Sequence, residues 1–451
     1  MNGLIMTAQL LLSLTILVVL HEFGHFITAR LFKMRVEKFY LFFDFLFPLG
    51  NVLKFSLFKI KKGDTEYGIG WFPLGGYVNI SGMIDESMNT DQMKSEPQPW
   101  EFRSKPAWQR LIVILGGVIV NVILGIIIFT SIMHVYGEKK TPLAEVNKLG
   151  IHAGDFAKEV GFTEGDKIVS MNGTSLKYFE EIFESKNIMA DEVYFDVERN
   201  GEVKRIQMTH DFIARLSKSK AEFISPINIS VVEQLSDKLT NAKDAGVQVN
   251  DRIIGGGDTT LMYFHELQAY LKNHAGQKVT LKIVRNTSDT LQIPVAVDGE
   301  GRIGFQPAYN SIFHVDTITY SWGSAVPKGF GVAYQTFADQ LSGLKKIFTG
   351  RIKAQDALSG PIGIAQAFGG HWNWEWFWRL TGLISLVLAI MNLLPIPGLD
   401  GGYAIFILWE LFTGRKVSDT VMTRALNIGL IIILLLTFFA LGNDIFKIFK
   451  K

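Results

Sequence analysis

The chain has 451 residues, a formal net charge of +2 and a hydrophobic content of 48%. The balanced charge gives no indication of a nucleic-acid partner, and the lack of cysteine excludes disulfides and thiolate metal ligands. The hydrophobic content is high for a soluble protein, so membrane-spanning segments are expected.

A first span is predicted over residues 1–30, which carry no charge from Leu4 to Leu20. A membrane-spanning helix needs about 20 predominantly apolar residues. The N-terminal residues lack both the basic segment and the cleavage site of a signal peptide. We therefore predict a transmembrane helix here.

This span contains HEFGH, which fits the pattern H-E-x-x-H. On a helix, His21 and His25 share one face and can bind one metal ion, and Glu22 can take a proton from the attacking water. The alternative is a pair of core histidines beside a capping glutamate. An ionised group at bilayer depth costs about 2.5–3.5 kcal/mol, so a functional site is the better interpretation.

A polar loop is predicted over residues 31–106. Within it, KFSLFKI (54–60) and TEYGIGWF (65–72) predict a β-hairpin, which either serves the site or is only structural. The segment PLGGYV (73–78) follows the hairpin.

A second span is predicted over residues 107–136. Gly116, Gly117 and Gly125 would allow neighbouring helices to approach closely, and Asn121 offers a buried polar contact. The asparagine fits a contact between helices at least as well as a functional role.

An internal repeat of roughly 85 residues follows the second span. GFTEGDKIVSMNG at residue 161 matches AGVQVNDRIIGGG at residue 245, and Asp166 aligns with Asp251. Each copy predicts a strand, a turn, a helix and an alternating strand. The copies resemble tandem PDZ domains, at 137–225 and 226–310. Such domains bind extended peptides by strand addition, and rigid spacers are the alternative.

A linker is predicted over residues 311–371, with apolar side chains from Phe330 to Phe348 at helical spacing. This pattern fits a helix lying on a bilayer about as well as a helix packed on one of the repeats. A third span is predicted over 372–402, a loop over 403–424 and a fourth span over 425–446.

The third span ends in NLLPIPGLDGG, where Asp400 is the only acidic residue between Glu375 and Glu410. Pro395 and Pro397 cannot continue a helix, and broken backbone at membrane depth is tolerated where it lines a protein cavity. The first and third spans run in the same direction, so Asp400 and HEFGH lie toward the same membrane face. Asp400 is therefore predicted as the third metal ligand.

Together, HEFGH in a first span, GGVIVN in a second and NLLPIPGLDGG after a PDZ-like tandem resemble the site-2 protease family of intramembrane zinc metalloproteases. The resemblance implies a polytopic α-helical membrane protein with four transmembrane helices, a membrane-associated β-hairpin or sheet and two tandem PDZ-like α+β domains. It implies a Zn²⁺ cofactor bound by His21, His25 and Asp400, with Glu22 as the catalytic base. The implied substrate-binding residues are Asn392, Pro395, Pro397, Gly75, Gly76 and Tyr77.

The resemblance also implies a location and a substrate. The family's bacterial members with this plan lie in the inner membrane, with the PDZ domains in the periplasm and the active site toward the cytoplasm. The implied substrate is a single-pass membrane protein, such as an anti-sigma factor already trimmed by another protease, in an envelope stress response. Membrane lipid and peptide ligands of the PDZ domains are further expected partners. We further hypothesise that the tandem excludes bulky substrates.

Two other functions fit parts of the sequence. A membrane scaffold would use the PDZ-like domains for binding and would contain an inactive metal site. A zinc transporter would need ligands spread along a path through the membrane, whereas the predicted ligands lie at one depth.

Overall fold

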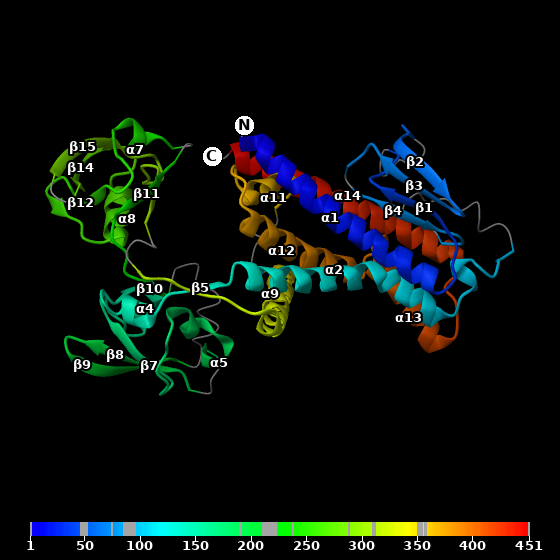
Figure 1. Ribbon diagram of the computed structural model, residues 1–451, viewed down its shortest axis with the longest axis horizontal. Helices are drawn as coiled ribbons and strands as arrows, with labels where there is room; N and C mark the ends of the chain where they lie inside the picture. The colour runs from blue at the N-terminus through cyan, green and yellow to red at the C-terminus, as the bar shows by residue number, and fades with distance from the viewer. Residues whose placement is uncertain are drawn as a thin grey trace. The chain divides into compact units, whose positions relative to one another are not determined.

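The computed structural model describes residues 2–45, 53–73, 75–83, 96–188, 192–209, 223–236, 239–286, 289–308, 313–349, 355 and 359–449. The chain forms two compact units, which are described separately (Figure 1). Unit 1 comprises Met1–Gly137 and Thr319–Lys451, and unit 2 comprises Glu138–Ile318. A few side chains implicated above, including that of Phe348, lie outside the described residues.

Unit 1 contains long helices and one small sheet. Its helices are α1 (Asn2–Leu31), the 3₁₀ turn η2 (Phe102–Ser104), α2 (Ala107–Val135), α9 (Trp322–Phe348), α11 (Pro361–Phe368), α12 (Trp374–Leu393), α13 (Asp400–Thr413) and α14 (Asp419–Phe449). Its strands are β1 (Val36–Leu41), β2 (Ser56–Lys62), β3 (Thr65–Gly70) and β4 (Tyr77–Ile80).

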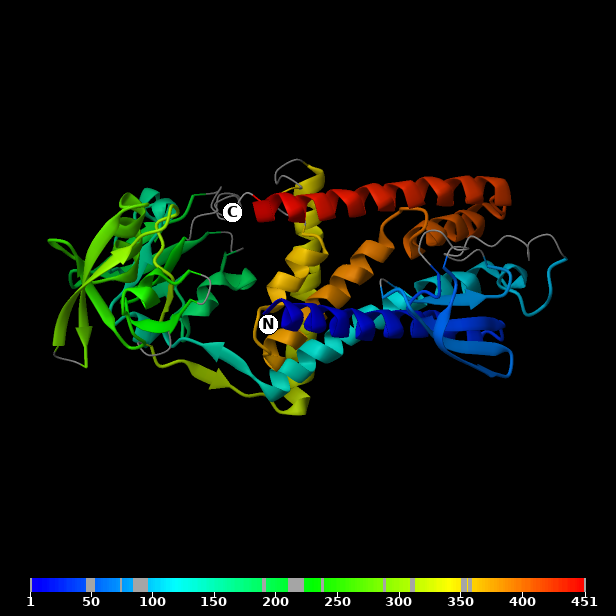
Figure 2. The same cartoon turned by 90° about the horizontal axis from the view of Figure 1, so that it is seen from above.

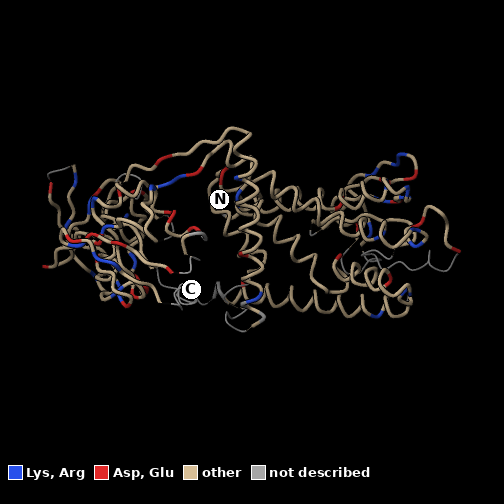
Figure 3. The backbone as a smooth tube through the Cα atoms, turned by 90° about the horizontal axis from the view of Figure 1, so that it is seen from below, with Lys and Arg blue, Asp and Glu red and all other residues tan. Residues whose placement is uncertain are grey.

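Helices α1, α2, α12 and α14 are long and apolar enough to cross a membrane, and each corresponds to one predicted span. Figure 3 shows that the long stretches of these helices carry few charged residues. The surface of α14 gives the clearest indication of a membrane, because Ile428, Leu435 and Phe438 are each more than half exposed. A soluble protein rarely leaves such a continuous apolar surface uncovered, whereas lipid would cover it. The chain is thus a membrane protein.

Helix α2 is central to the packing of unit 1, since it contacts α1, α9, α12 and α13 (Figure 2). Small residues permit these close contacts. A side chain at Gly24 of α1 would meet the carbonyl oxygen of Gly116 at 2.3 Å, and one at Gly329 of α9 would meet Thr130 at 2.4 Å. The amphipathic pattern from Phe330 to Phe348 corresponds to α9, which packs on α2. Phe330 and Tyr334 of this helix are exposed.

The predicted hairpin is present as the antiparallel pair β2–β3, and it belongs to a four-stranded sheet in the order β2-β3-β1-β4. Strands β1 and β3 are parallel, and β1 and β4 are antiparallel. Strand β4 is at one edge and contacts α1, so the sheet stands beside the helix that carries HEFGH. The segment that the sequence suggested as a loop after the third span begins instead with α13.

Unit 2 is built from short elements. Its helices are α3 (Leu143–Val146), α4 (Asp155–Glu159), the 3₁₀ helix η3 (Phe179–Phe183), α5 (Ser185–Ile188), α7 (Asn241–Asp244) and α8 (Phe264–Asn273). Its strands are β5 (Glu138–Lys140), β6 (Ile151–Ala153), β7 (Lys167–Met171), β8 (Tyr194–Arg199), β9 (Glu202–Gln207), β10 (Ile224–Pro226), β11 (Val232–Leu235), β12 (Arg252–Gly256), β13 (Thr259–Thr260), β14 (Lys278–Arg285), β15 (Asp289–Ala296), β16 (Phe305–Pro307) and β17 (Asp316–Ile318).

Two separate hydrophobic cores divide unit 2 into halves. The first core is formed by residues between Leu143 and Ile224, and the second by residues between Val232 and Ile303. The halves correspond in element order: β7, η3, β8 and β9 in the first match β12, α8, β14 and β15 in the second. The helical segment differs, being a 3₁₀ turn in the first half and a ten-residue α-helix in the second.

The same buried ion pair recurs in both halves. Asp166 accepts hydrogen bonds from the Arg199 guanidinium at 2.7 Å, and Asp251 accepts equivalent bonds from Arg285 at 2.7–2.8 Å. Each arginine also donates to a glycine carbonyl, that of Gly161 or Gly246. This shared arrangement supports the internal repeat, because aligned aspartates occupy the same position in each half.

Strands β5 and β17 begin and end unit 2 and pair with each other. They are antiparallel, with Lys140 opposite Asp316 and Glu138 opposite Ile318. The chain therefore enters and leaves unit 2 at adjacent points.

Candidate metal centre

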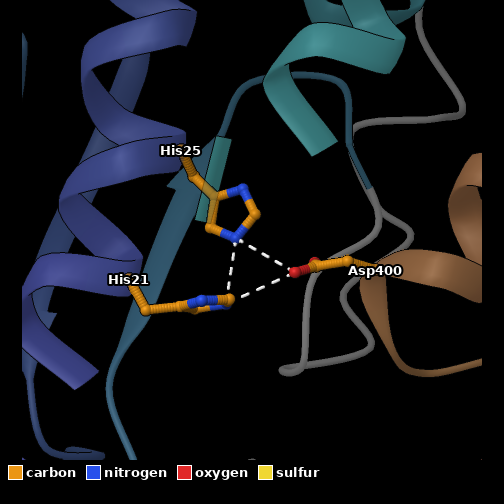
Figure 4. A group of neighbouring side chains, drawn as sticks. All are labelled: His21, His25 and Asp400. Carbon is orange, nitrogen blue, oxygen red and sulfur yellow. Dashed lines mark hydrogen bonds and ion pairs between the residues drawn. The ribbon is translucent and has the colours of Figure 1, made fainter. Parts of the chain in front are cut away.

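The three predicted ligands converge in unit 1 (Figure 4). His21 Nε2 lies 3.3 Å from Asp400 Oδ2, His25 Nε2 lies 3.5 Å from the same oxygen, and the two Nε2 atoms are 3.3 Å apart. Ligands at about 2.1 Å from a tetrahedral zinc ion stand about 3.4 Å from one another. The three atoms thus form a triangle of the size that zinc requires.

The Asp400 carboxylate supports the same conclusion. Among the described residues, its buried Oδ2 has no hydrogen-bond donor, although it faces two imidazoles. A buried carboxylate oxygen without a partner is costly. Two imidazoles acting as metal ligands would present lone pairs rather than N–H groups to this oxygen. A bound cation would satisfy all three atoms, so the donor set fits zinc.

Contacts behind the imidazoles orient both rings. His25 Nδ1 lies 2.9 Å from the carbonyl oxygen of Val113, which can only accept, so Nδ1 carries the proton and Nε2 is free to bind metal. His21 Nδ1 lies 3.2 Å from the Asn121 amide nitrogen, and Asn121 Oδ1 is buried without a hydrogen bond. Exchanging the amide oxygen and nitrogen would let Oδ1 accept the His21 Nδ1 proton, which gives both groups a partner.

The interruption of the helix between α12 and α13 brings Asp400 to the two histidines. The helix ends at Leu393, and the following segment folds back so that Asp400 begins α13. Glycines make the fold-back possible: Gly398 has a φ of +96°, and a side chain at Gly402 would meet the Ile396 carbonyl at 2.4 Å. Helix α14 also contacts this loop, at Gly429.

Gly117 in α2 lies against both imidazoles. A Cβ atom there would stand 2.5 Å from His21 Cε1 and 2.6 Å from His25 Nε2. Any side chain at this position would occupy the space of the ligand rings. The glycine therefore shapes the site as well as the helix contact.

Glu22 lies on α1 between the two histidines and interacts electrostatically with His21, His25 and Asp400. Its carboxylate also accepts a hydrogen bond from the backbone N–H of Val78 in β4. The carboxylate is thus positioned between the ligand cluster and the edge of the sheet. It can receive a proton beside the cluster without occupying a ligand position.

The predicted substrate-binding residues lie at different places around the cluster. Asn392 Nδ2 is 3.3 Å from His21 Nε2, and a Cβ atom at Gly76 would be 3.4 Å from Glu22 Cγ, so both positions border the site. Tyr77 is different, because its ring is buried in the sheet's core and its hydroxyl donates to Asp44 at 2.9 Å. Its side chain therefore belongs to the core of the sheet.

The other three predicted positions have less direct contacts. Pro395 and Pro397 belong to the fold-back segment, and the carbonyl of Pro397 faces Gly429 of α14. A Cβ atom at Gly75 would meet the ring of Phe43 at 2.5 Å. The fold-back segment thus packs on α14, and Gly75 packs on Phe43.

Two residues of the site were not identified as such from the sequence. The sequence leaves Asn121 open between a contact between helices and a functional role, and at Gly117 it indicates only a close approach of helices. The signal for both was their spacing of four residues, which places them on one face of α2. The sequence alone does not show that this face meets HEFGH.

Comparisons with known proteins agree with this chemistry. The model of the family described as "Peptidase family M50" matches residues 9–436. A regulator of sigma E protease from Haemophilus influenzae is 29% identical over 97% of this chain and 98% of its own. The regulator of sigma-E protease RseP of Escherichia coli is 27% identical over 97% of both chains. A relative from Treponema pallidum that carries a zinc metalloprotease name is 26% identical over 96% of this chain and 97% of its own.

Proposed function

The chain belongs to peptidase family M50, the site-2 protease family, and is a metalloprotease of that type; from this premise we propose that it hydrolyses a peptide bond within a transmembrane segment of another protein. The observation that carries the proposal is the triangle of His21, His25 and Asp400 beside Glu22. Because α1 is a candidate membrane span, a site on this helix acts on a bond at membrane depth.

We assign a role to each residue of this site. His21, His25 and Asp400 would hold Zn²⁺, which when bound would polarise a peptide carbonyl and acidify water. Glu22 takes the proton of the attacking water and then delivers it to the leaving amine. The contacts of Val113 and Asn121 keep the imidazoles in the orientation that leaves Nε2 free.

Strand β4 supports a mode of substrate binding. It is at the edge of its sheet and borders Glu22, so an extended peptide could add to it by backbone hydrogen bonds. Strand addition would open the substrate's helix and expose a carbonyl to the metal centre. Gly76 keeps side-chain bulk away from this approach, and Asn392 would hold the substrate backbone.

We propose a single-pass membrane protein as substrate, such as an anti-sigma factor already shortened by another protease. Support comes from relatives named as regulators of sigma E protease, which match nearly the whole chain. The two halves of unit 2 are proposed to be PDZ domains on the periplasmic side of a bacterial inner membrane, with the metal centre toward the cytoplasm. The repeated strand-helix-strand order supports the assignment of the two halves as PDZ domains.

The test is cleavage of a single-pass substrate in proteoliposomes. The purified full-length protein should cut within the transmembrane segment, as mapped by mass spectrometry of the products. Removing metal with a chelator should stop cleavage, and Zn²⁺ should restore it. Cleavage that persists in the metal-free protein, or that maps only outside the membrane segment, would contradict the proposal.

A further inference from the structure

A second group of metal-binding side chains lies in unit 2. Within the described residues, His152, Glu164 and His265 each offer one ligand atom, and these atoms lie within 4.8 Å of one another. His152 is in β6, and Glu164 is in the turn before β7, so both belong to the first half. His265 is near the start of α8 in the second half. The cluster therefore joins two halves that have separate cores.

The geometry of this cluster centres on the carboxylate. His152 Nδ1 lies 2.9 Å from Glu164 Oε2, and His265 Nε2 lies 3.3 Å from Glu164 Oε1. The separation of His265 from Glu164 matches the spacing of about 3.2–3.4 Å between ligands in a tetrahedral zinc site, and the separation of His152 from Glu164 is shorter. The imidazoles stack, with ring centroids 4.1 Å apart and planes 22° from parallel.

We propose that His152, Glu164 and His265 form a second Zn²⁺ site, which bridges the two halves of unit 2. Two imidazoles and one carboxylate are a typical zinc donor set, whereas Mg²⁺ and Ca²⁺ prefer oxygen ligands alone. The fourth position is open to water, because the three side chains are 21–34% exposed. Binding a shared ion requires these partly exposed, stacked rings to rotate until one nitrogen of each faces the ion.

Neighbouring groups are compatible with a bound cation. Lys158 interacts electrostatically with His265, but it is exposed and can turn into solvent. Glu266 adds negative charge nearby, while its carboxylate stays bound to the backbone N–H groups of Met262 and Tyr263. The site therefore has a ligand set, an entry from solvent and a favourable local charge.

The expected consequence is a metal-dependent link between the halves. An ion that binds only when both halves contribute ligands favours their docked arrangement. Zinc would therefore stabilise unit 2 against separation of its halves, independently of the chemistry in unit 1.

The experiment counts zinc in the purified full-length protein. Protein in detergent is stripped with a chelator, loaded with ZnCl₂, dialysed and analysed by plasma mass spectrometry. Wild type should retain two zinc ions per chain. His265→Ala and Glu164→Gln should each retain one, the double variant His21→Ala with His25→Ala should retain the other one, and combining the two sets should leave none.

His274→Ala is the matched control. His274 caps the C-terminus of the same helix, and among its described contacts its imidazole hydrogen-bonds only to the Tyr270 carbonyl and packs on the Tyr270 ring. It should retain two ions. Circular dichroism checks that each variant is folded, and Glu164→Gln preserves side-chain volume should an alanine variant unfold.

A wild-type protein that retains one ion, lost entirely when His21 and His25 are replaced, would overturn the proposal. So would undiminished zinc in folded Glu164→Gln and His265→Ala. Zinc at each site is counted separately. If the site in unit 1 binds no zinc, zinc bound by His152, Glu164 and His265 is therefore still detected.

Discussion

At the scale of single residues, the proposed metal centre assigns ion binding and proton transfer to different groups. Three side chains form the ligand triangle. Glu22 lies beside it and accepts a hydrogen bond from the backbone N–H of Val78 in β4. This separation makes the roles experimentally distinguishable, since zinc content and cleavage rate report on different residues.

Glu22→Gln should abolish proteolysis while zinc remains bound. The amide has nearly the same shape but cannot accept the proton of the attacking water. Loss of general-base catalysis should lower the cleavage rate by at least about 100-fold. Zinc analysis and a cleavage assay on the same preparation measure both quantities. A folded variant that has lost its zinc would show that Glu22 acts as a ligand.

Asp400→Asn should lower zinc occupancy together with activity. An uncharged amide is a weaker zinc ligand than a carboxylate. Titrating zinc into the stripped protein gives the affinity, and Asp44→Asn, a buried aspartate bound to Tyr77, serves as a control for general effects of losing a carboxylate. Unchanged affinity in Asp400→Asn would point to a different third ligand.

Gly117→Ala should disrupt the ligand triangle, because its methyl carbon would stand 2.5 Å from His21 Cε1 and 2.6 Å from His25 Nε2, which is much closer than van der Waals contact. We expect reduced zinc content and activity in a protein that still folds. Gly125→Ala is the matched control in the same helix, since its methyl group would meet the Leu386 side chain, at 2.7 Å from Cδ2 and 2.9 Å from Cγ, and neither imidazole. Equal loss of zinc in both variants would mean that general packing of α2 is responsible.

At the scale of elements, much of the fold was predictable because the signals are local. Long apolar stretches identified α1, α2, α12 and α14, and alternating polarity around a turn identified the β2–β3 hairpin. The parallel partner of the hairpin, β1, was not predicted, since pairing between strands far apart in sequence leaves no local pattern. Helix α13 was also missed, because its proline- and glycine-rich approach obscures the helical spacing that follows.

The arrangement of the candidate metal centre was predictable to a similar extent. H-E-x-x-H places two histidines on one helix face, and Asp400 was the only acidic candidate in its segment. The neighbours Asn121 and Gly117 were not assigned to it, because their roles depend on which face of α2 meets α1. That choice is made by the close contact of Gly24 with Gly116.

The repeated ion pair makes an element-scale prediction about pH. Burial opposes ionisation of Asp166 and Asp251, but hydrogen bonds from Arg199 and Arg285 and from backbone N–H groups outweigh it and lower the pKa of each carboxyl. A lowered folded-state pKa stabilises the fold above the unfolded value of about 3.9. This stability is lost as the pH falls through the folded-state pKa, so unit 2 should lose stability in acid below about pH 4.

Replacing either aspartate removes this contribution at neutral pH. Asp251→Asn should destabilise the second half by about 1–3 kcal/mol, because the amide cannot accept all the hydrogen bonds that Arg285 and the Gln248 N–H donate to the buried carboxylate. Asp196→Asn is the matched control, since its partner Arg205 is 59% exposed and an exposed ion pair contributes little to stability. Hydrogen exchange of β12 and β7 in the full-length protein measures the two effects. Equal protection in both variants would show that the buried pair contributes little.

At the scale of the whole molecule, the chain inserts unit 2 between α2 and α9. We hypothesise that the inserted unit excludes substrates with a large folded domain. Replacing residues 141–315 by Asn-Gly should then allow cleavage of untrimmed substrate. Lys140 and Asp316 are paired in register, so this splice closes β5 and β17 into a two-residue hairpin.

Cleavage of one substrate with and without its bulky domain should be compared in the intact and spliced proteins. The intact protein should cut only the trimmed form, and the spliced protein should cut both. Glu22→Gln in the spliced protein controls for contaminating proteases. If a stable, membrane-inserted spliced protein still rejects the bulky form, or if the intact protein cuts both forms, the exclusion hypothesis is wrong.

The pairing of β5 with β17 also bears on how such a chain can change over evolution. Because the inserted unit begins and ends at adjacent points, its length has little influence on the separation of α2 and α9. Closing a longer loop costs only about 0.6 kcal/mol for each doubling of its length. A lineage could therefore duplicate, lose or exchange a repeat in a single event while the metal centre keeps its geometry. The internal repeat in this chain is the kind of record that such a duplication would leave.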